Sequence, residues 1–324
     1  MRLESIERLF LKMAMKLISI VTPCYNEEEN IRELYDRVKE AMSLIAGYDY
    51  EHIFIDNAST DKTVEILRRI TEKDRNVKVI INTRNFGHIR SSYHAFVNAP
   101  GEAVIHIVSD LQDPPEMIAD FIRKWEEGYK IVIGVKEKSE ESPLLFAIRK
   151  MYYHLIGKLS EIDLVKNFTG FGLYDRRVVD IMRQMDDPYP YLRGLICEIG
   201  FEKAEIPYVQ PTRKRGFTKN NFYTLYDMAM LGITNHSKVP LRLATMTGFA
   251  VALLSLLVAF GYFIYKLISW DNFSVGTAPL VIGLFFFSSV QLFFIGIIGE
   301  YVGAIHTQVL KRPLVIEKER INFD

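Results

Sequence analysis

The sequence predicts an α/β domain with a mostly parallel sheet, followed by a hairpin of two membrane-spanning helices. Two observations lead to this fold class. Short apolar runs alternate with helix-length segments up to residue 240, and two long runs without charged residues follow. Strands that alternate with helices are typical of parallel sheets. About 20 consecutive apolar residues are enough to cross a bilayer as a helix.

Five short apolar runs are the expected strands of the sheet. Each has the length of a buried strand and is followed by polar or turn-forming residues. They are residues 17–21 (LISIV), 52–55 (HIFI), 77–81 (VKVII), 103–108 (AVIHIV) and 130–135 (KIVIGV).

Helices are expected between these strands. Asn26 and Glu29 have the spacing of a helix N-cap and its partner, which predicts that residues 26–30 open a helix. A second helix is expected over 62–73. A third begins at Pro114, because proline is favoured in the first turn of a helix.

Polar side chains follow each of the first four expected strands. They lie at residues 23–27, 56–57, 82–87 and 109–113, and Lys136 follows the fifth strand. In sheets of this kind, ligands bind at the carboxyl ends of the strands. Four polar strand ends that meet at one edge therefore predict a ligand site there.

A cluster of hard oxygen ligands is the clearest chemical signal at that edge. Asp110, Gln112 and Asp113 suit Mg²⁺ or Mn²⁺, which take carboxylate and carbonyl oxygens and share substrate phosphates. An alternative role for Asp113 is to cap the helix that begins at Pro114. The sequence has no P-loop, no G-x-G-x-x-G, no zinc-type spacing and no G-x-S-x-G elbow, so kinases, ordinary dehydrogenases and serine hydrolases are not expected.

The overall composition excludes two further classes of protein. Lys and Arg number 40 and Asp and Glu number 40, so the formal net charge is zero, whereas nucleic-acid binders usually have a basic excess. No nucleic-acid partner is expected. The 2 cysteines are too few for a disulfide scaffold. The hydrophobic fraction of 49% excludes a disordered chain.

A basic cluster lies between the α/β part and the apolar runs. Residues 213–219 (RKRGFTK) contain Arg213, Arg215 and Lys219. Its position, after an oxygen-rich site and before a bilayer, suits a phosphate that is carried on a lipid. The alternative is a solvated patch or one that contacts lipid headgroups.

Two uncharged runs, 243–265 and 278–299, are each long enough to span a bilayer. The alternative, buried core helices, is disfavoured because the runs are separated only by a short polar link. Residues 221–237 have helical apolar spacing, which indicates an amphipathic helix either on the membrane surface or packed on the domain. Glycines in both runs permit close helix packing and a homo-oligomer.

The flanking charges predict the orientation of the hairpin. Cations stand before the first run and after the second, and the link between the runs holds only one. By the positive-inside rule, we expect a multi-pass protein of the cytoplasmic (inner) membrane with both termini and the large domain in the cytoplasm. The cations in question are Lys238, Arg242, Lys311 and Arg312 at the outer ends and Lys266 in the link.

An ordered set of motifs resembles a known enzyme family. VTPCYNEEENI, FIDNASTDKT, TRNFGH and SDLQDPPE, in this order, are similar to the inverting family 2 glycosyltransferases, which have the Rossmann-like GT-A fold. FTGFGLYDRRVVD, RGL, TRKRGFTK, the two apolar runs and a closing KRPL resemble the polyisoprenyl-phosphate glycosyltransferases, the group of dolichol-phosphate mannose synthase and the bactoprenol glucosyltransferases. The resemblance covers residues from about 16 to 316.

The resemblance implies roles for individual residues. Asp110 and Gln112, with Asp113 beside them, would hold the metal and the donor diphosphate. Lys136 and the cluster cations Arg213, Arg215 and Lys219 would face the acceptor phosphate, with Arg149 as a further helper. The nucleotide would be bound by Pro23, Tyr25, Glu27, Asp56, Asn57, Arg84 and Asn85.

The sequence departs from the family pattern at several of these positions. Asn57 replaces the second acid of V-D-D-G-S, and Val108 replaces the first acid of D-A-D-L-Q. Lys136 stands where the family often has Arg. Gly170 and Gly172 replace the Asp and Arg of G-D-F-R-L, so no general base is assigned there.

The implied activity is an inverting, metal-dependent transfer of a sugar from a nucleotide to polyprenyl phosphate at the cytoplasmic face, for modification of a cell-surface glycan. Glucose from UDP-glucose is the preferred donor. The alternatives are a mannose synthase that uses GDP-mannose and a non-catalytic membrane subunit with a degenerate GT-A domain. The expected parts are an N-terminal extension (1–15), the GT-A domain (16–220), a juxtamembrane helix (221–240), two membrane helices (241–304) and a C-terminal tail (305–324).

Overall fold

The computed structural model describes residues 15–138, 165, 167–211, 230, 234, 237–268 and 277–323. The described residues fall into two compact units. The first, here called the sheet domain, comprises 15–138, 165–211 and 310–323. The second, the helical hairpin, comprises the described residues from 230 to 309. The expectations for residues 1–14, Arg149 and the stretch 213–229 lie outside the described residues.

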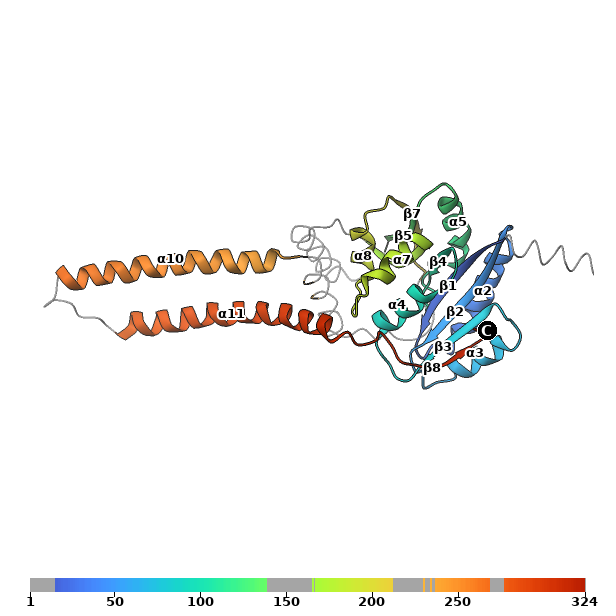
Figure 1. Cartoon of the computed structure of the whole chain (residues 1–324), viewed down its shortest axis with the longest axis horizontal. Coiled ribbons are helices and arrows are strands. Elements are labelled where there is room, and N and C mark those ends of the chain that lie inside the picture. Colours follow the sequence, from blue (N-terminus) through green and yellow to red (C-terminus); the bar gives the residue numbers. More distant parts are fainter. Residues whose placement is uncertain are drawn as a thin grey trace, which may run out of the picture. The chain divides into compact units, whose positions relative to one another are not determined.

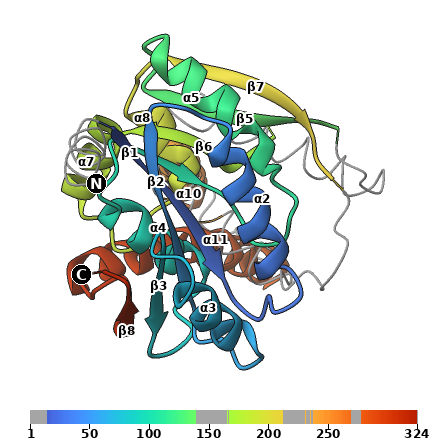
Figure 2. The same cartoon turned by 90° about the vertical axis from the view of Figure 1, so that its right-hand side faces the viewer.

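The sheet domain is built on eight strands in the order β7-β5-β6-β4-β1-β2-β3-β8 (Figures 1 and 2). The pairs β1–β2, β2–β3, β1–β4 and β5–β7 are parallel, and β4–β6, β5–β6 and β3–β8 are antiparallel. The strands are β1 (Lys16–Cys24), β2 (Tyr48–Asp56), β3 (Val77–Asn82), β4 (Ala103–His106), β5 (Ile131–Lys138), β6 (Phe168–Asp175), β7 (Lys203–Val209) and β8 (Glu317–Ile321).

Helices cover both faces of this sheet, as Figure 2 shows. One face packs against α2 (Ile31–Ser43), α3 (Thr63–Thr71) and, after the short helix η1 (Pro115–Met117), α5 (Ile118–Glu126). The other face packs against α4 (His88–Asn98), α7 (Arg176–Met185) and α8 (Leu192–Glu198).

The central strands are apolar on both sides because both faces are covered. Along β1, Ile20 packs into the first core and the next residue, Val21, into the second. Along β2, Phe54 and Ile55 alternate in the same way. This period of two residues turns a continuous apolar run into contacts with two separate helix layers.

The five expected strands are all present, with small differences at their ends. The helix at Pro114 is confirmed as η1 running into α5. The expected helix start at Asn26 is wrong, because α2 begins at Ile31. Asn26 instead has a left-handed backbone (φ 54°), and its side-chain oxygen accepts a hydrogen bond from the Thr60 amide at 2.8 Å. It therefore joins two loops rather than capping a helix.

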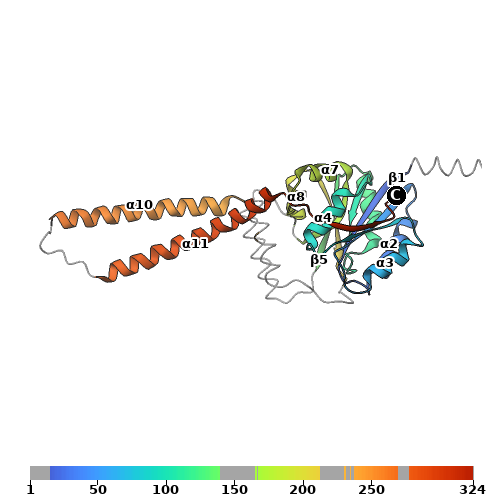
Figure 3. The same cartoon turned by 60° about the horizontal axis from the view of Figure 1, so that its bottom comes forward.

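The helical hairpin consists of α10 (Val239–Ile268) and α11 (Thr277–Leu310) (Figures 1 and 3). Both are long and apolar enough to cross a membrane, over Val239–Tyr265 and Gly283–Leu310. Their apolar side chains are not buried by protein, and Phe249 is 72% exposed. The alternative of buried core helices is therefore not supported. The Tyr301 hydroxyl of α11 donates to the carbonyl of Ser237, just before α10, at 2.6 Å.

The sheet topology brings eight strands to one functional edge. The parallel strands β1, β2, β3, β4, β5 and β7 end there. The antiparallel strands β6 and β8 begin there, because Phe168 pairs with Val135 and Glu317 pairs with Asn82. We call this edge the carboxyl edge. The sequence predicted five of these strand ends, those of β1 to β5, but not β6, β7 and β8.

Candidate functional site

The carboxyl edge has two halves, which are defined here by their strands. The β1–β3 half contains the loops that follow β1, β2 and β3. The β4–β7 half contains the loop after β4, the ends of β5 and β7, and the start of β6. The residues expected to bind nucleotide lie in the first half. Those expected to bind metal lie in the second.

Asn57 is the centre of a hydrogen-bond network in the β1–β3 half. Its side-chain oxygen accepts from Asn82 Nδ2 at 3.2 Å and from the Phe86 amide at 2.9 Å. Its side-chain nitrogen donates to Asn85 Oδ1 at 2.8 Å. Asn85 Oδ1 also accepts from the Gly87 amide at 2.8 Å. Asn57 is 5% exposed, so this buried amide uses donor and acceptor together to hold the loop after β3.

A second set of contacts joins the loops after β1 and β2. The Asn26 amide donates to Ser59 Oγ at 2.9 Å, and the Glu27 amide donates to Thr63 Oγ1 at 2.8 Å. Asp56 is fully buried at the end of β2, where its Oδ2 accepts from the Ser59 amide at 2.9 Å. Burial raises the pKa of this carboxyl group.

The remaining expected nucleotide residues surround these loops. Pro23, Tyr25 and Glu27 are half-buried at the end of β1. The Arg84 guanidinium stacks on the Phe86 ring, 4.0 Å from its centroid, in the exposed loop after β3. The structure thus gathers all seven expected nucleotide residues on the loops of three neighbouring strands.

Asp113 is held tightly in the β4–β7 half. Its Oδ2 accepts from the Val108 amide at 3.3 Å, and its Oδ1 accepts from the Tyr208 hydroxyl of β7 at 3.0 Å. Asp113 is 2% exposed, and this burial raises its pKa to about 6. The nearby positive charge of Lys136 acts in the opposite direction and lowers the pKa. Both carboxylate oxygens already have protein partners.

Asp110 is less enclosed than Asp113. The Gln112 amide donates to Asp110 Oδ1 at 3.1 Å, across a turn in which Leu111 has a left-handed backbone (φ 62°). Within the part of the chain that the structure describes, no hydrogen bond to Asp110 Oδ2 is formed. Asp110 and Gln112 are both half-buried, so their side-chain oxygens remain accessible.

These residues fit a divalent cation of the magnesium type. Such ions are usually held by one or two carboxylates together with substrate phosphates and water. Asp110 supplies one accessible carboxylate and Gln112 one amide oxygen. Among the described residues, no group of three or more His, Cys, Asp or Glu side chains surrounds a metal position. The arrangement therefore suits an ion that is shared with a diphosphate rather than one enclosed by protein.

Lys136 lies beside Asp113 and Tyr208. It pairs with Tyr208 in the β5–β7 register, and its amide donates to the Asn167 carbonyl at 3.3 Å. Sequence reasoning missed Tyr208. The alternation in the run KAEIPYV could have indicated a strand, but nothing in it indicates a contact with Asp113.

Gly170, at the position of the family's missing acid, has φ 107°. Few L-residues adopt this conformation, so the backbone itself favours glycine here. A Cβ at this position would lie 3.6 Å from Nδ1 of His106. His106 is buried, which lowers its pKa to about 4, and Ser92 Oγ lies 2.7 Å from its Nε2. The imidazole is therefore neutral at physiological pH.

Strained backbone gathers at the same edge. Four non-glycine residues with positive φ, from 54° to 63°, lie in loops that follow β1, β2 and β4 or precede β6. Such conformations cost about 1–3 kcal/mol each and cluster at functional sites. Two of them have no polar side chain to offset the strain. The four are Asn26, Ala58, Leu111 and Asn167.

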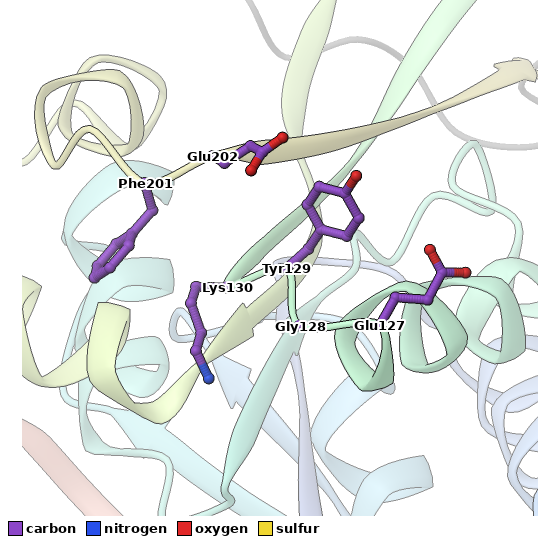
Figure 4. A pocket seen from close by; sticks show the side chains of 6 residues that line it. All are labelled: Glu127, Gly128, Tyr129, Lys130, Phe201 and Glu202. Carbon is purple, nitrogen blue, oxygen red and sulfur yellow. The ribbon is translucent and has the colours of Figure 1, made fainter.

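A hollow of about 430 Å³ lies elsewhere in the domain, at the amino ends of β5 and β7 (Figure 4). Lys130, one of its three charged lining residues, pairs with Asp175 at 3.0 Å. Because it opens at the opposite end of these strands from Lys136 and Tyr208, it is not part of the carboxyl edge. The lining residues are Glu127, Gly128, Tyr129, Lys130, Phe201 and Glu202. The expected acceptor residues Arg213, Arg215 and Lys219 lie outside the described residues.

Comparison with known proteins identifies relatives over nearly the whole chain. The family model described as glycosyl transferase family 2 matches residues 19–181, and that described as the GtrB C-terminal hairpin matches 239–305. The uncharacterized glycosyltransferase YkcC of Bacillus subtilis is 37% identical, over 94% of each chain. The SfII prophage-derived bactoprenol glucosyl transferase of Shigella flexneri is 33% identical, over 93% of this chain and 97% of its own.

Solved structures match part of the chain. The glucosyl-3-phosphoglycerate synthase of Mycobacterium tuberculosis, crystallised with Mn²⁺, UDP and phosphoglyceric acid, is 20% identical. It covers 69% of this chain and 79% of its own, with a TM-score of 0.47. The mostly parallel mixed sheet and the two C-terminal apolar helices together give a GT-A fold followed by a hairpin.

Proposed function

This chain belongs to glycosyltransferase family 2, and from that premise we propose that it transfers glucose from UDP-glucose to polyprenyl phosphate. The observation that carries the proposal is the pairing of two features on one edge. The β1–β3 half is a hydrogen-bonded set of polar loops, and the β4–β7 half presents an accessible carboxylate at Asp110. Similarity to bactoprenol glucosyl transferases over 93% of the chain supports the sugar and the lipid.

The donor nucleotide is assigned to the β1–β3 half. Asp56 contacts the base, and Asn57 acts through the loop that contains Arg84 and Asn85. The hydrogen bonds around Asn57 support this assignment, because they fix the loop before any ligand arrives. Pro23, Tyr25 and Glu27 complete the proposed nucleotide site on the side of β1.

Asp110 and Gln112 are assigned to hold Mg²⁺ or Mn²⁺ together with the donor diphosphate. A bound divalent cation supplies neutralisation of the charge that develops on the leaving diphosphate. Asp113 was also expected as a ligand. Its two engaged oxygens make it better suited to fixing the turn in which Asp110 lies.

The acceptor needs no general base. The second pKa of a phosphate monoester is near about 6, so an acceptor oxygen is already an anion at cytoplasmic pH. This oxygen forms a bond to sugar C1 as the bond from C1 to the diphosphate oxygen breaks, and UDP leaves with the electron pair. Attack from the opposite side inverts C1. Lys136, with Arg213, Arg215 and Lys219, counters the repulsion between the two phosphate groups.

The two apolar helices associate the protein with a membrane. Their match to a family hairpin and the cations at the outer ends of the spans support a cytoplasmic catalytic domain in the inner membrane, with both termini on the same side. A homo-oligomer, packed through the glycines of the spans, is part of the proposal.

A panel of donors and acceptors tests the function. Purified full-length protein is incubated with labelled UDP-glucose, GDP-mannose or UDP-GlcNAc, with bactoprenyl or dolichyl phosphate, and with Mg²⁺, Mn²⁺ or chelator. Labelled glucose in the organic phase, in the presence of metal only, is expected. Preferred transfer of mannose indicates the mannose synthase alternative. Full activity in chelator contradicts the metal assignment, and no transfer from any donor favours the non-catalytic subunit.

A further inference from the structure

The chain returns to the sheet domain immediately after α11. Residues 311–316 follow the last residue of that helix, and β8 then pairs antiparallel with β3 at the edge of the sheet (Figure 1). Val315 is 5% exposed, and Leu314 packs against the core on the α4 side of the sheet. This short segment is therefore an integral part of the sheet domain, anchored by apolar burial and by a strand pairing.

The same segment binds the chain at both ends of the loop that follows β3. At the start of the loop, the Thr83 amide donates to the Ile316 carbonyl at 2.9 Å, and the Thr83 hydroxyl donates to the same oxygen at 3.1 Å. Past its end, in the first turn of α4, Arg90 Nη2 donates to the Pro313 carbonyl at 2.9 Å. Figure 3 shows this dark red segment running past α4.

One further contact continues this attachment along α4. His94 Nε2 lies 2.5 Å from Glu317 Oε1, and Arg320 pairs with the same carboxylate from within β8. Segment 313–317 thus touches Thr83, Arg90 and His94, which bracket the loop 84–87 on its two sides. The loop's own inward attachment is to Asn57, through Asn85 and the Phe86 amide.

We propose that segment 313–317 is a clasp that positions the loop 84–87 for binding of the nucleotide sugar, with Arg90 as its principal positioning residue. The inference rests on the proposed function, which assigns that loop to the donor. Asn57 holds the middle of the loop through Asn85 and the Phe86 amide, and the clasp holds the residues on both sides of the loop. Loss of Arg90 leaves the start of α4 without its tie to Pro313, so the loop samples more arrangements and the donor binds less well.

Matched variants distinguish the loss of the clasp's contact beside the loop from a general weakening of β8. Arg90→Ala removes the tie beside the loop. Arg68→Ala removes the ion pair to Glu319, which joins α3 to the other part of β8, away from the loop. Arg90→Lys keeps a cationic donor. Each full-length variant is assayed for transfer with UDP-glucose and bactoprenyl phosphate varied separately, and its melting temperature is recorded.

Arg90→Ala is expected to raise the KM for UDP-glucose about tenfold, the effect of losing one hydrogen bond from a charged donor. The KM for the lipid phosphate and kcat stay within about twofold. Arg90→Lys recovers part of the loss. Arg68→Ala lowers the melting temperature without raising the donor KM. The proposal is wrong if Arg90→Ala leaves the KM for UDP-glucose unchanged, or if Arg68→Ala raises that KM by the same factor.

Amide hydrogen exchange gives a readout that does not depend on turnover. In Arg90→Ala, exchange at residues 84–90 is expected to accelerate, while exchange in α3 stays as in the wild type; Arg68→Ala shows the reverse. Unchanged exchange at 84–90 in Arg90→Ala refutes the clasp. If the wild type transfers no sugar, the proposed function fails, and the exchange pattern still decides whether segment 313–317 holds the loop.

Discussion

The two halves of the carboxyl edge prepare for their ligands in different ways. In the β1–β3 half, the polar side chains bond to each other, and the Asn57 side chain alone makes three hydrogen bonds. In the β4–β7 half, one carboxylate is fully engaged and the other keeps an oxygen accessible. Asp113 accepts from Val108 and Tyr208, whereas Asp110 accepts only from the Gln112 amide within the described residues.

This difference follows from what each half is proposed to bind. A nucleotide is recognised by shape and by directional hydrogen bonds, so a preformed loop with satisfied amides is an advantage. A divalent cation needs free oxygen atoms, and a carboxylate already bonded on both oxygens is a poor ligand. We therefore expect substitutions in the β4–β7 half to act by changing the charge near the cation. Substitutions in the β1–β3 half should act by displacing the loop that binds the nucleotide.

The largest effect is expected from Asp110→Asn. The amide keeps the size of the side chain and removes the charge that would face the cation, so transfer should fall about 10² to 10³-fold. The measurement is the initial rate of labelled glucose transfer across a titration of Mn²⁺. Asp120→Asn is the matched control, because Asp120 is a surface residue of α5 that pairs only with its helix neighbour Arg123 in the described structure. Equal rates for the two variants would remove Asp110 from the metal site.

Much of the fold was predictable because the buried strands are apolar on both faces. The runs at β1, β2, β3, β4 and β5 need no knowledge of their partners to be recognised. The strand β8 (EKERI) could not be found this way. It is an edge strand whose residues alternate between half-buried and exposed, and its charged side chains form ion pairs with Arg68 and His94, far away in the sequence.

The candidate site was predictable in its location but not in its internal bonding. The polar strand ends identified the edge. The sequence also presented Asn57 as the loss of an acid, whereas the structure shows an amide that donates and accepts at once, which a carboxylate cannot do. The partner of Asp113 is Tyr208, which lies 95 residues further along the sequence, and no motif spacing links the two.

An intermediate effect is expected from Asn57→Asp, which restores the family's second acid. The carboxylate still accepts from Asn82 and Phe86, but it has no proton for Asn85 Oδ1 and repels it. Asn85 Oδ1 keeps its hydrogen bond from the Gly87 amide, so the cost comes from the repulsion between this oxygen and the new carboxylate, which displaces the loop after β3. We expect a donor KM about tenfold higher with little change in the metal titration.

The control for this variant is Asn98→Asp. Asn98 lies at the exposed end of α4, and its amide donates only to the His94 carbonyl in the described structure. If Asn57→Asp instead binds UDP-glucose more tightly than the wild type, the preformed network is not what selects the nucleotide. The β1–β3 half would then act by charge, like its neighbour.

The smallest effect is expected from Tyr208→Phe, which removes one hydrogen bond to Asp113 and leaves Asp110 untouched. Asp113 has a pKa of about 6 in the folded protein, above its ordinary 3.8, so it favours folding most when protonated, and that contribution is lost as pH rises through 6. Without the Tyr208 hydroxyl the anion is less stable, and this pKa rises further.

The melting temperatures of variant and wild type should therefore be similar near pH 5 and diverge towards pH 8, with the variant lower. A melting-temperature gap that stays constant with pH would mean that Tyr208 only packs, and that Asp113 does not respond to it.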